Sequence, residues 1–259
     1  MKTLTKYLNE KLVIFPSQVD EKLVINKNYK NPYTCVPKTF DELRKIINDR
    51  YDKLGPGTKD NPIDFNDVNI SNIDSFYNDN INIGIFYRTR FEYIDISDWD
   101  VSNVKNMYVA FYDCEQLKSV DLSNWDVSNV KDMSCMFQGC IQLKSVGDLS
   151  NWNVSKVENM NAMFYMCKQL KSVGDLSDWN VSNVRIMSFM FIDCKQLKSV
   201  GDLSNWNVSN TKHISFMFYN CKLLKSVGDL SNWNVSKVIN MGFMFKESGI
   251  TNIPTWYKE

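Results

Sequence analysis

Apolar residues recur along this chain at a nearly constant interval. Six tryptophans mark the period, with a first interval of 26 residues and later intervals of 27: Trp99, Trp125, Trp152, Trp179, Trp206 and Trp233. A fixed period in the twenties is the sequence signature of a solenoid, in which each unit is one supersecondary turn that stacks on its neighbours. The pattern predicts a repeat solenoid of about seven turns.

The first part of each unit has the pattern of a short strand. In "LKSVDLSNW", the apolar positions of a leucine-rich repeat are taken by Leu117, Val120, Leu122 and Trp125. Later units carry one additional residue at equivalent places, and it is always a glycine: Gly147, Gly174, Gly201 and Gly228. Because glycine tolerates φ > 0, we expect a bulge at each of these positions.

The second part of each unit has the spacing of a helix. Its apolar residues recur at steps of three and four, as on one helical face: in one unit they are Val130, Met133, Phe137 and Cys140. Ser128 is the expected N-cap, and Ser155 with Glu158 forms a capping box in the next unit. The predicted fold class is therefore α/β, with a short strand and a helical turn in every 26–27 residues.

Residues 1–62 lie outside the periodic pattern and predict an amino-terminal arm with a capping helix. The segment "TFDELRKIINDRYDKLG" indicates one amphipathic helix, with Thr39 and Glu42 as a capping box and Gly55 at its end. A solenoid must shield its terminal coils, so we expect this helix to cover the first coil. Before it, "NEKLVI" and "DEKLVI" form a short duplication that the pattern does not place.

Residues 63–259 are assigned to the solenoid, with irregular units at both ends. The segment "DFNDVNISNIDSF" aligns with "DLSNWDVSNVKDM" when Val68 takes the position of the indole, so it is a degenerate first unit. An insertion at residues 77–90 follows. In the last unit Ser248 replaces a recurring cysteine, and residues 249–259 are expected to form a closing cap.

The unit "NWDVSNVKDMSCMFQGCIQLKSV" resembles the BspA-like leucine-rich repeats of bacterial surface proteins. The shared parts are W-D/N-V-S-N-V, M-x-x-M-F and C-x-x-L-K-S-V, and the resemblance covers roughly residues 64–250. It implies a curved solenoid that acts as an adhesin and binds a host or partner protein.

Composition and charge exclude some classes of protein. The chain has 30 basic and 30 acidic side chains, so the basic excess of a nucleic-acid-binding protein is missing. The sequence has no run of about 18 apolar residues, so no membrane insertion is predicted. The amino terminus lacks the apolar core and the small-residue cleavage site of a signal peptide.

Five cysteines occupy one equivalent position in the repeats: Cys114, Cys140, Cys167, Cys194 and Cys221. Paired ligands such as C-x-x-C with histidine partners are missing, so we expect neither a metal site nor a cofactor. A thiol is a small apolar group, and it is expected to fill the core of each unit in a reducing compartment.

The recurring tryptophans allow two interpretations, a surface platform on which sugars stack or a buried column. The buried column is favoured because the indole occupies an inward position of the repeat and an exposed ladder would be a large apolar patch. The Met and Phe pairs are assigned to the core by the same argument. Asn153 and its equivalents, in the "NVS" segments, are expected to form Asx turns.

Candidate contact residues are two charged columns on the predicted sheet face: Lys118, Lys144, Lys171, Lys198 and Lys225, beside Asp121, Asp148, Asp175, Asp202 and Asp229. They are expected either to neutralise each other or to bind a protein partner. Catalytic residues are not assigned, because these groups repeat evenly along a rod instead of converging in a pocket. The chain is therefore predicted to be a non-enzymatic protein-binding module.

Three settings remain open for this module. The family resemblance implies a cell-surface adhesin, whereas the missing signal peptide and the unpaired cysteines favour a cytoplasmic or virion-associated interaction protein. The opening "MKTLTKYLNE" resembles the capsid-targeting leader of tailed-phage internal head proteins, with cleavage implied after Glu10. A carbohydrate-binding repeat protein, with a glycan as partner, is the third alternative.

Overall fold

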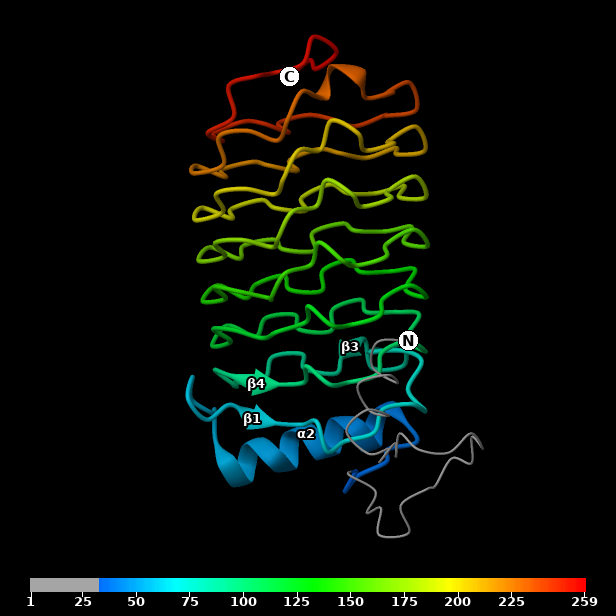
Figure 1. The fold of residues 1–259 in the computed structure, drawn as a ribbon, viewed down its shortest axis with the longest axis vertical. Coiled ribbons are helices and arrows are strands. Elements are labelled where there is room, and N and C mark those ends of the chain that lie inside the picture. The colour runs from blue at the N-terminus through cyan, green and yellow to red at the C-terminus, as the bar shows by residue number, and fades with distance from the viewer. Residues whose placement is uncertain (1–32) are drawn as a thin grey trace, which may run out of the picture.

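The chain winds into coils that stack along one axis (Figure 1). The computed structural model describes residues 33–259, so the short duplication and the leader-like decapeptide lie outside the described residues. In the described part, regular secondary structure is limited to helix α2 (Phe40–Leu54), the short 3-10 helix η1 (Leu230–Asn232) and the two-residue strands β1 (Ile63–Asp64), β2 (Tyr77–Asn78), β3 (Ile83–Gly84) and β4 (Ile94–Asp95).

Successive coils pair through parallel bridges instead of long strands. One series connects seven equivalent positions, in agreement with the predicted number of turns: Ser75, Asn106, Asp132, Asn159, Ile186, His213 and Asn240. On the predicted strand, pairing is reduced to single bridges, such as Ser119 with Ser145. Strands β1 and β4 form the parallel pair of the first coils, with Ile63 opposite Ile94.

The prediction of a helical turn in each unit is wrong. The apolar spacing of this segment comes from two tandem β-turns. Two tandem β-turns are closed by hydrogen bonds from Met136 N–H to Met133 O (3.3 Å) and from Cys140 N–H to Phe137 O (3.1 Å). The third residue of each turn is left-handed, with φ 54° at Cys135 and 79° at the glycine of the second turn. Apolar side chains thus face inward at steps of three and four without a helix.

The tandem turns also bond one coil to the next. Phe137 N–H donates to Met163 O at 2.8 Å, and three more donors of the same segment reach the following coil. In a helix these N–H groups would be used internally. We call the surface formed by residues 133–140 and their equivalents the turn face.

The residues that were predicted to cap helices take part in Asx turns instead. Ser128 N–H donates to the Asp126 carboxylate at 3.0 Å, and Ser155 N–H donates to the Asn153 amide oxygen at 3.2 Å. Asn153 therefore forms the Asx turn expected of it, whereas the capping box of Ser155 with Glu158 has no helix to cap.

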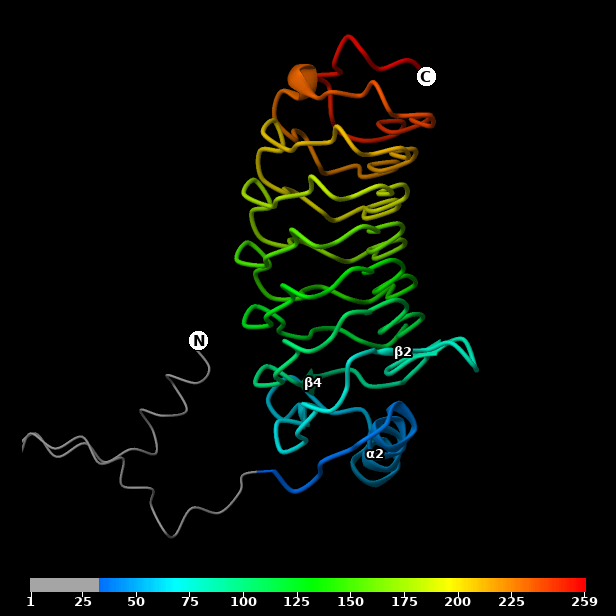
Figure 2. The same ribbon diagram turned by 90° about the vertical axis from the view of Figure 1, so that its right-hand side faces the viewer.

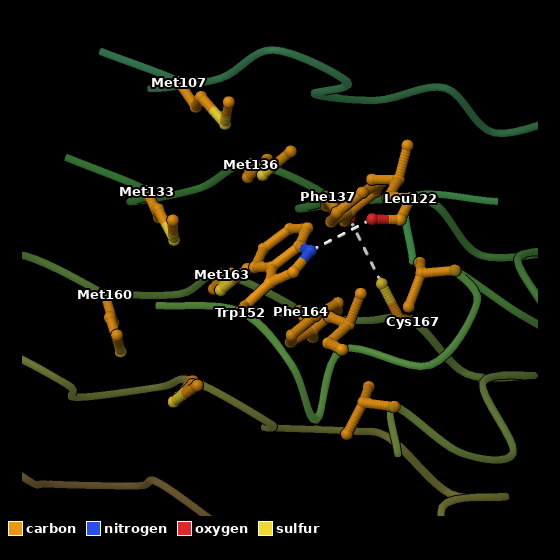
Figure 3. Close-up of a cluster of buried hydrophobic side chains, with 14 of the residues drawn as sticks. Met107, Leu122, Met133, Met136, Phe137, Trp152, Met160, Met163, Phe164 and Cys167 are labelled. Atoms are coloured by element: carbon orange, nitrogen blue, oxygen red, sulfur yellow. Dashed lines mark hydrogen bonds between the residues drawn. The ribbon is translucent and has the colours of Figure 1, made fainter. Parts of the chain in front are cut away.

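Indoles and thiols bind each coil to the preceding one. Trp152 Nε1 donates to Leu122 O at 3.0 Å and Cys167 Sγ to Phe137 O at 3.2 Å (Figure 3). The six predicted tryptophans are 3–4% exposed, and the five column thiols are at most 1% exposed. The buried interpretation is confirmed for both columns, so the tryptophans do not form a sugar platform.

Helix α2 lies at the amino-terminal end of the stack (Figure 1). Thr39 Oγ1 accepts a hydrogen bond from Glu42 N–H at 3.2 Å, and Leu43 and Ile47 are fully buried in the common core. Two arginines attach the helix to the first coils. Arg44 donates to Tyr87 O at 2.7 Å, and Arg50 forms an ion pair with Asp67 at 2.7 Å.

The insertion at residues 77–90 contains the antiparallel pair β2–β3, with Tyr77 opposite Gly84. In Figure 2 this hairpin extends beyond the outline of the coils. Its residues also join the neighbouring coil, because Phe86 N–H donates to Ala110 O at 2.8 Å.

The irregular units keep the register of the core. Val68 N–H bonds to Phe65 O at 2.9 Å, as Trp99 N–H does to Ile96 O at 3.1 Å, so Val68 does occupy the indole position. At the other end Trp256 stacks on Trp233 at 6.1 Å. The carboxyl-terminal segment thus extends the tryptophan column although its spacing departs from the period.

The added glycines are required by their backbone and by the preceding coil. Gly174 has φ +88°, and a Cβ atom there would lie 2.0 Å from Asp148 Oδ1. Asp148 is held in place because its Oδ1 accepts a hydrogen bond from Ser150 N–H at 3.0 Å. Each added glycine therefore accommodates the carboxylate beneath it.

Gly174→Ala is expected to lower the free energy of unfolding by about 1–3 kcal/mol, because alanine is strained at positive φ and displaces Asp148. Gly242→Ala is the matched control, since its Cβ would meet nothing closer than 3.9 Å. Urea unfolding of both variants measures the difference. Equal stability of the two would contradict the proposed role of Asp148.

Candidate functional site

The predicted lysine column is exposed along the sheet face, apart from its first member. Lys144, Lys171, Lys198 and Lys225 are exposed. Lys118 is half-buried and forms an ion pair with Glu92 at 2.5 Å, which raises the pKa of Lys118. A hollow of about 500 Å³ brings Lys118, Asp121 and Lys144 together beside strand β4.

The predicted aspartate column is turned toward its own backbone. Each carboxylate accepts the N–H of the serine two residues later, as Asp175 does from Ser177 at 3.0 Å. Hydrogen bonds from the Ser177 hydroxyl and N–H lower the pKa of Asp175. Within residues 33–259, no ion pair of 4.0 Å or less joins the lysine column to the aspartate column. The two columns are thus not joined by direct ion pairs, and the aspartates stabilise turns.

The turn face carries an aromatic column that sequence reasoning assigned to the core. Phe189 stacks on Phe216 at a centroid distance of 5.2 Å, and Phe243 lies tilted by 40° against Phe216 at 5.0 Å. Phe189 and Phe216 are half-buried, whereas Phe243 is 40% exposed and lies under the Lys246 ammonium at 4.8 Å. We call these three residues the phenylalanine column.

All three rings belong to residues with left-handed backbone, at φ 61°, 56° and 57°. Bulky side chains are rare in this region, where glycine or asparagine is cheaper. Earlier coils have Val109, Cys135 and Ala162 at the same position. The sequence signal was the change from "SCMF" and "NAMF" to "SFMF" and "GFMF" in the last three units.

Residues 33–259 hold no group of three or more His, Cys, Asp or Glu side chains that could bind a metal ion. Burial raises the pKa of Cys194 and that of Cys221, the latter to about 12, so these thiols are poor nucleophiles. The same residues contain no helix with the length and apolar character needed to cross a bilayer.

Fold and surface together define a repeat solenoid whose distinctive residues lie in columns on its faces. The sequence profile described as "Mycoplasma protein of unknown function, DUF285" matches residues 60–172 and 142–256. These matches cover more than half of the chain, and the chain belongs to this family.

A solved structure of a leucine-rich repeat protein from Eubacterium ventriosum is similar to this chain, with 21% sequence identity and a TM-score of 0.48. The similarity covers 73% of this chain and 44% of that protein, so the chain spans less than half of its length. No curated protein matches the chain.

Proposed function

We propose that this chain is a non-enzymatic protein-binding module of the adhesive type found in BspA-like surface proteins. Its contact surface is the phenylalanine column of the turn face, and the observation that carries the proposal is the left-handed, partly exposed placement of these rings. The left-handed backbone recurs in the tandem turn of every coil, so the last three coils are distinguished by carrying a large, partly exposed aromatic side chain at this position.

The chemistry of this surface suits a protein partner. Aromatic side chains are enriched in protein interfaces and contribute much of their binding energy. Tyr219 lies 5.6 Å from Phe216 and adds a hydroxyl group at the border of the column. The stacked coils beneath are packed and hydrogen-bonded, so the surface needs little ordering when it binds.

A second setting for the same module is a reducing compartment. All seven cysteines are free, including Cys35 and Cys135, which are only half-buried. Unpaired thiols of this kind persist where glutathione keeps them reduced. Labelling the two half-buried thiols in intact and in lysed cells would separate this setting from surface exposure.

The experiment compares two sets of substitutions in the full chain, immobilised and exposed to solubilised surface proteins. Phe189→Ser with Phe216→Ser is expected to weaken binding of a captured partner at least about tenfold, because two aromatic contacts are lost. Lys171→Glu with Lys198→Glu tests the predicted lysine column in the same assay.

Tryptophan fluorescence must show both variants folded. Binding that survives the phenylalanine substitutions overturns the assignment to the turn face. Binding that is lost only on lysine charge reversal places the contact on the sheet face instead.

A further inference from the structure

A second surface, separate from the phenylalanine column, concentrates positive charge in a neutral chain. A groove of about 460 Å³ is lined by five cationic residues, two asparagines and one carboxylate: Lys131, Lys156, Arg185, Lys212, Lys237, Asn183, Asn210 and Glu158. We call it the basic groove. It lies between the Asx turns and the turn face, and its five cationic side chains are exposed.

The backbone holds these charges in register. Glu158 N–H donates to Lys131 O, Arg185 N–H to Glu158 O, and Lys212 N–H to Arg185 O, each at 2.8 Å. Coils paired in this way are separated by about 4.8 Å, so Lys131 and Lys212 stand about 14 Å apart along the axis. Lys156 and Lys237 form a parallel row with the same separation, because they too are three coils apart.

Most of this charge lacks a partner within the described residues. Arg185 pairs with Glu158 at 3.4 Å, while no ion pair of 4.0 Å or less involves the four lysines of the groove. Two of them instead donate to amide oxygens, Lys156 to Asn129 at 2.6 Å and Lys237 to Asn210 at 2.8 Å. Arg185 and Lys212 lie on adjacent coils and repel each other, and an anionic ligand would relieve that repulsion.

We propose that the basic groove binds a linear anionic polysaccharide, with sulfate or carboxylate groups against the lysines and sugar hydroxyls against the two asparagines. A peptide ligand is less well matched, because the groove lining has neither apolar pockets nor an unpaired strand edge. A single-stranded nucleic acid would lack aromatic side chains to stack on.

The test uses the full chain and immobilised heparin as the polysulfated probe. Binding is expected at low ionic strength and is expected to weaken steeply toward about 0.15 M salt, as screening reduces the attraction. Lys131→Gln with Lys212→Gln should lower affinity about tenfold, since each exposed contact contributes up to about fivefold. Lys144→Gln with Lys225→Gln removes the same charge from the sheet face and should leave affinity within about twofold of the parent.

Competition identifies the ligand class. Heparin or alginate, but not dextran, should displace the chain, which separates sulfated and carboxylated glycans from neutral ones. Equal loss in the two lysine variants, or absence of heparin binding, overturns the proposal. Stronger competition by polyglutamate or oligo-dT overturns the assignment to a glycan. The Phe189→Ser and Phe216→Ser variant should still bind heparin, so failure of the protein-binding proposal is separately visible.

Discussion

Replacement of Trp179 by alanine is expected to lower the free energy of unfolding by about 3–5 kcal/mol. Trp179 is 3% exposed and stacks between Trp152 and Trp206 at 6.4 and 6.5 Å. Its Nε1 donates to Leu149 O at 2.9 Å, and the substitution removes this hydrogen bond from a buried carbonyl that keeps the one from Trp152 N–H at 3.0 Å. Because coils are stabilised by their neighbours, a defect in a central coil weakens the coupling on both sides.

Two variants separate the contributions. Trp179→Phe keeps an aromatic ring but loses the donor, so it should cost about 1–3 kcal/mol less than the alanine variant. Trp256→Ala, in the half-buried last position of the column, should cost less than Trp179→Ala. Urea titrations followed by fluorescence of the remaining tryptophans measure all three. A loss below about 1 kcal/mol for Trp179→Ala would contradict the central role of the column.

Alkaline pH is expected to destabilise the fold through the thiol column. Burial raises the pKa values of Cys167, Cys194 and Cys221, the last to about 12. Between the unfolded value of about 9 and the raised folded values, the unfolded chain releases protons that the folded chain keeps. Stability is therefore complete below the unfolded pKa and falls as pH rises above it. At pH 10 each thiol should remove about 1.4 kcal/mol, and the three together about 4 kcal/mol.

The matched comparison is the parent chain with Cys194→Ala, because lysines and tyrosines also titrate near pH 10. Unfolding free energies at pH 8 and pH 10 give the decrease for each protein. The decrease should be about 1.4 kcal/mol smaller in the variant. Identical decreases in the two proteins would mean that the Cys194 thiol ionises equally in both states.

Equivalent positions were predictable from the sequence because the period aligns them. One buried tryptophan or thiol implies a column, and Trp179 and Cys194 lie where that argument places them. The turn face was not predictable, because inward residues at steps of three and four fit both a helix and tandem turns. Glycines at the left-handed positions would have distinguished tandem turns from a helix. These positions lie four residues apart, but most of them are not glycine, as Asp193 and Asn220 illustrate.

The surface residues were also predicted only in part, because spacing alone does not show the direction of each side chain. Lys171 and Lys198 are exposed as expected. The role of Asp175 depends on a serine two residues later, a local pattern that also marks the Asx turn at Asn153. The phenylalanine column was not predicted as a surface feature, because each "FMF" segment has one inward and one outward ring. Only the turn geometry shows which ring points outward.

The backbone hydrogen bonds that join coils on the turn face all have the same direction. At each interface between the later coils, four N–H groups point to the following coil and the carbonyl groups that receive them point back, as in the bonds from residues 187, 189, 191 and 193. Peptide dipoles aligned in this way add up, as they do along an α-helix. The turn face therefore has electrical polarity along the stack, with its positive pole beside Phe243 and Lys246. A partner with an acidic border would be oriented by that field before it makes contact.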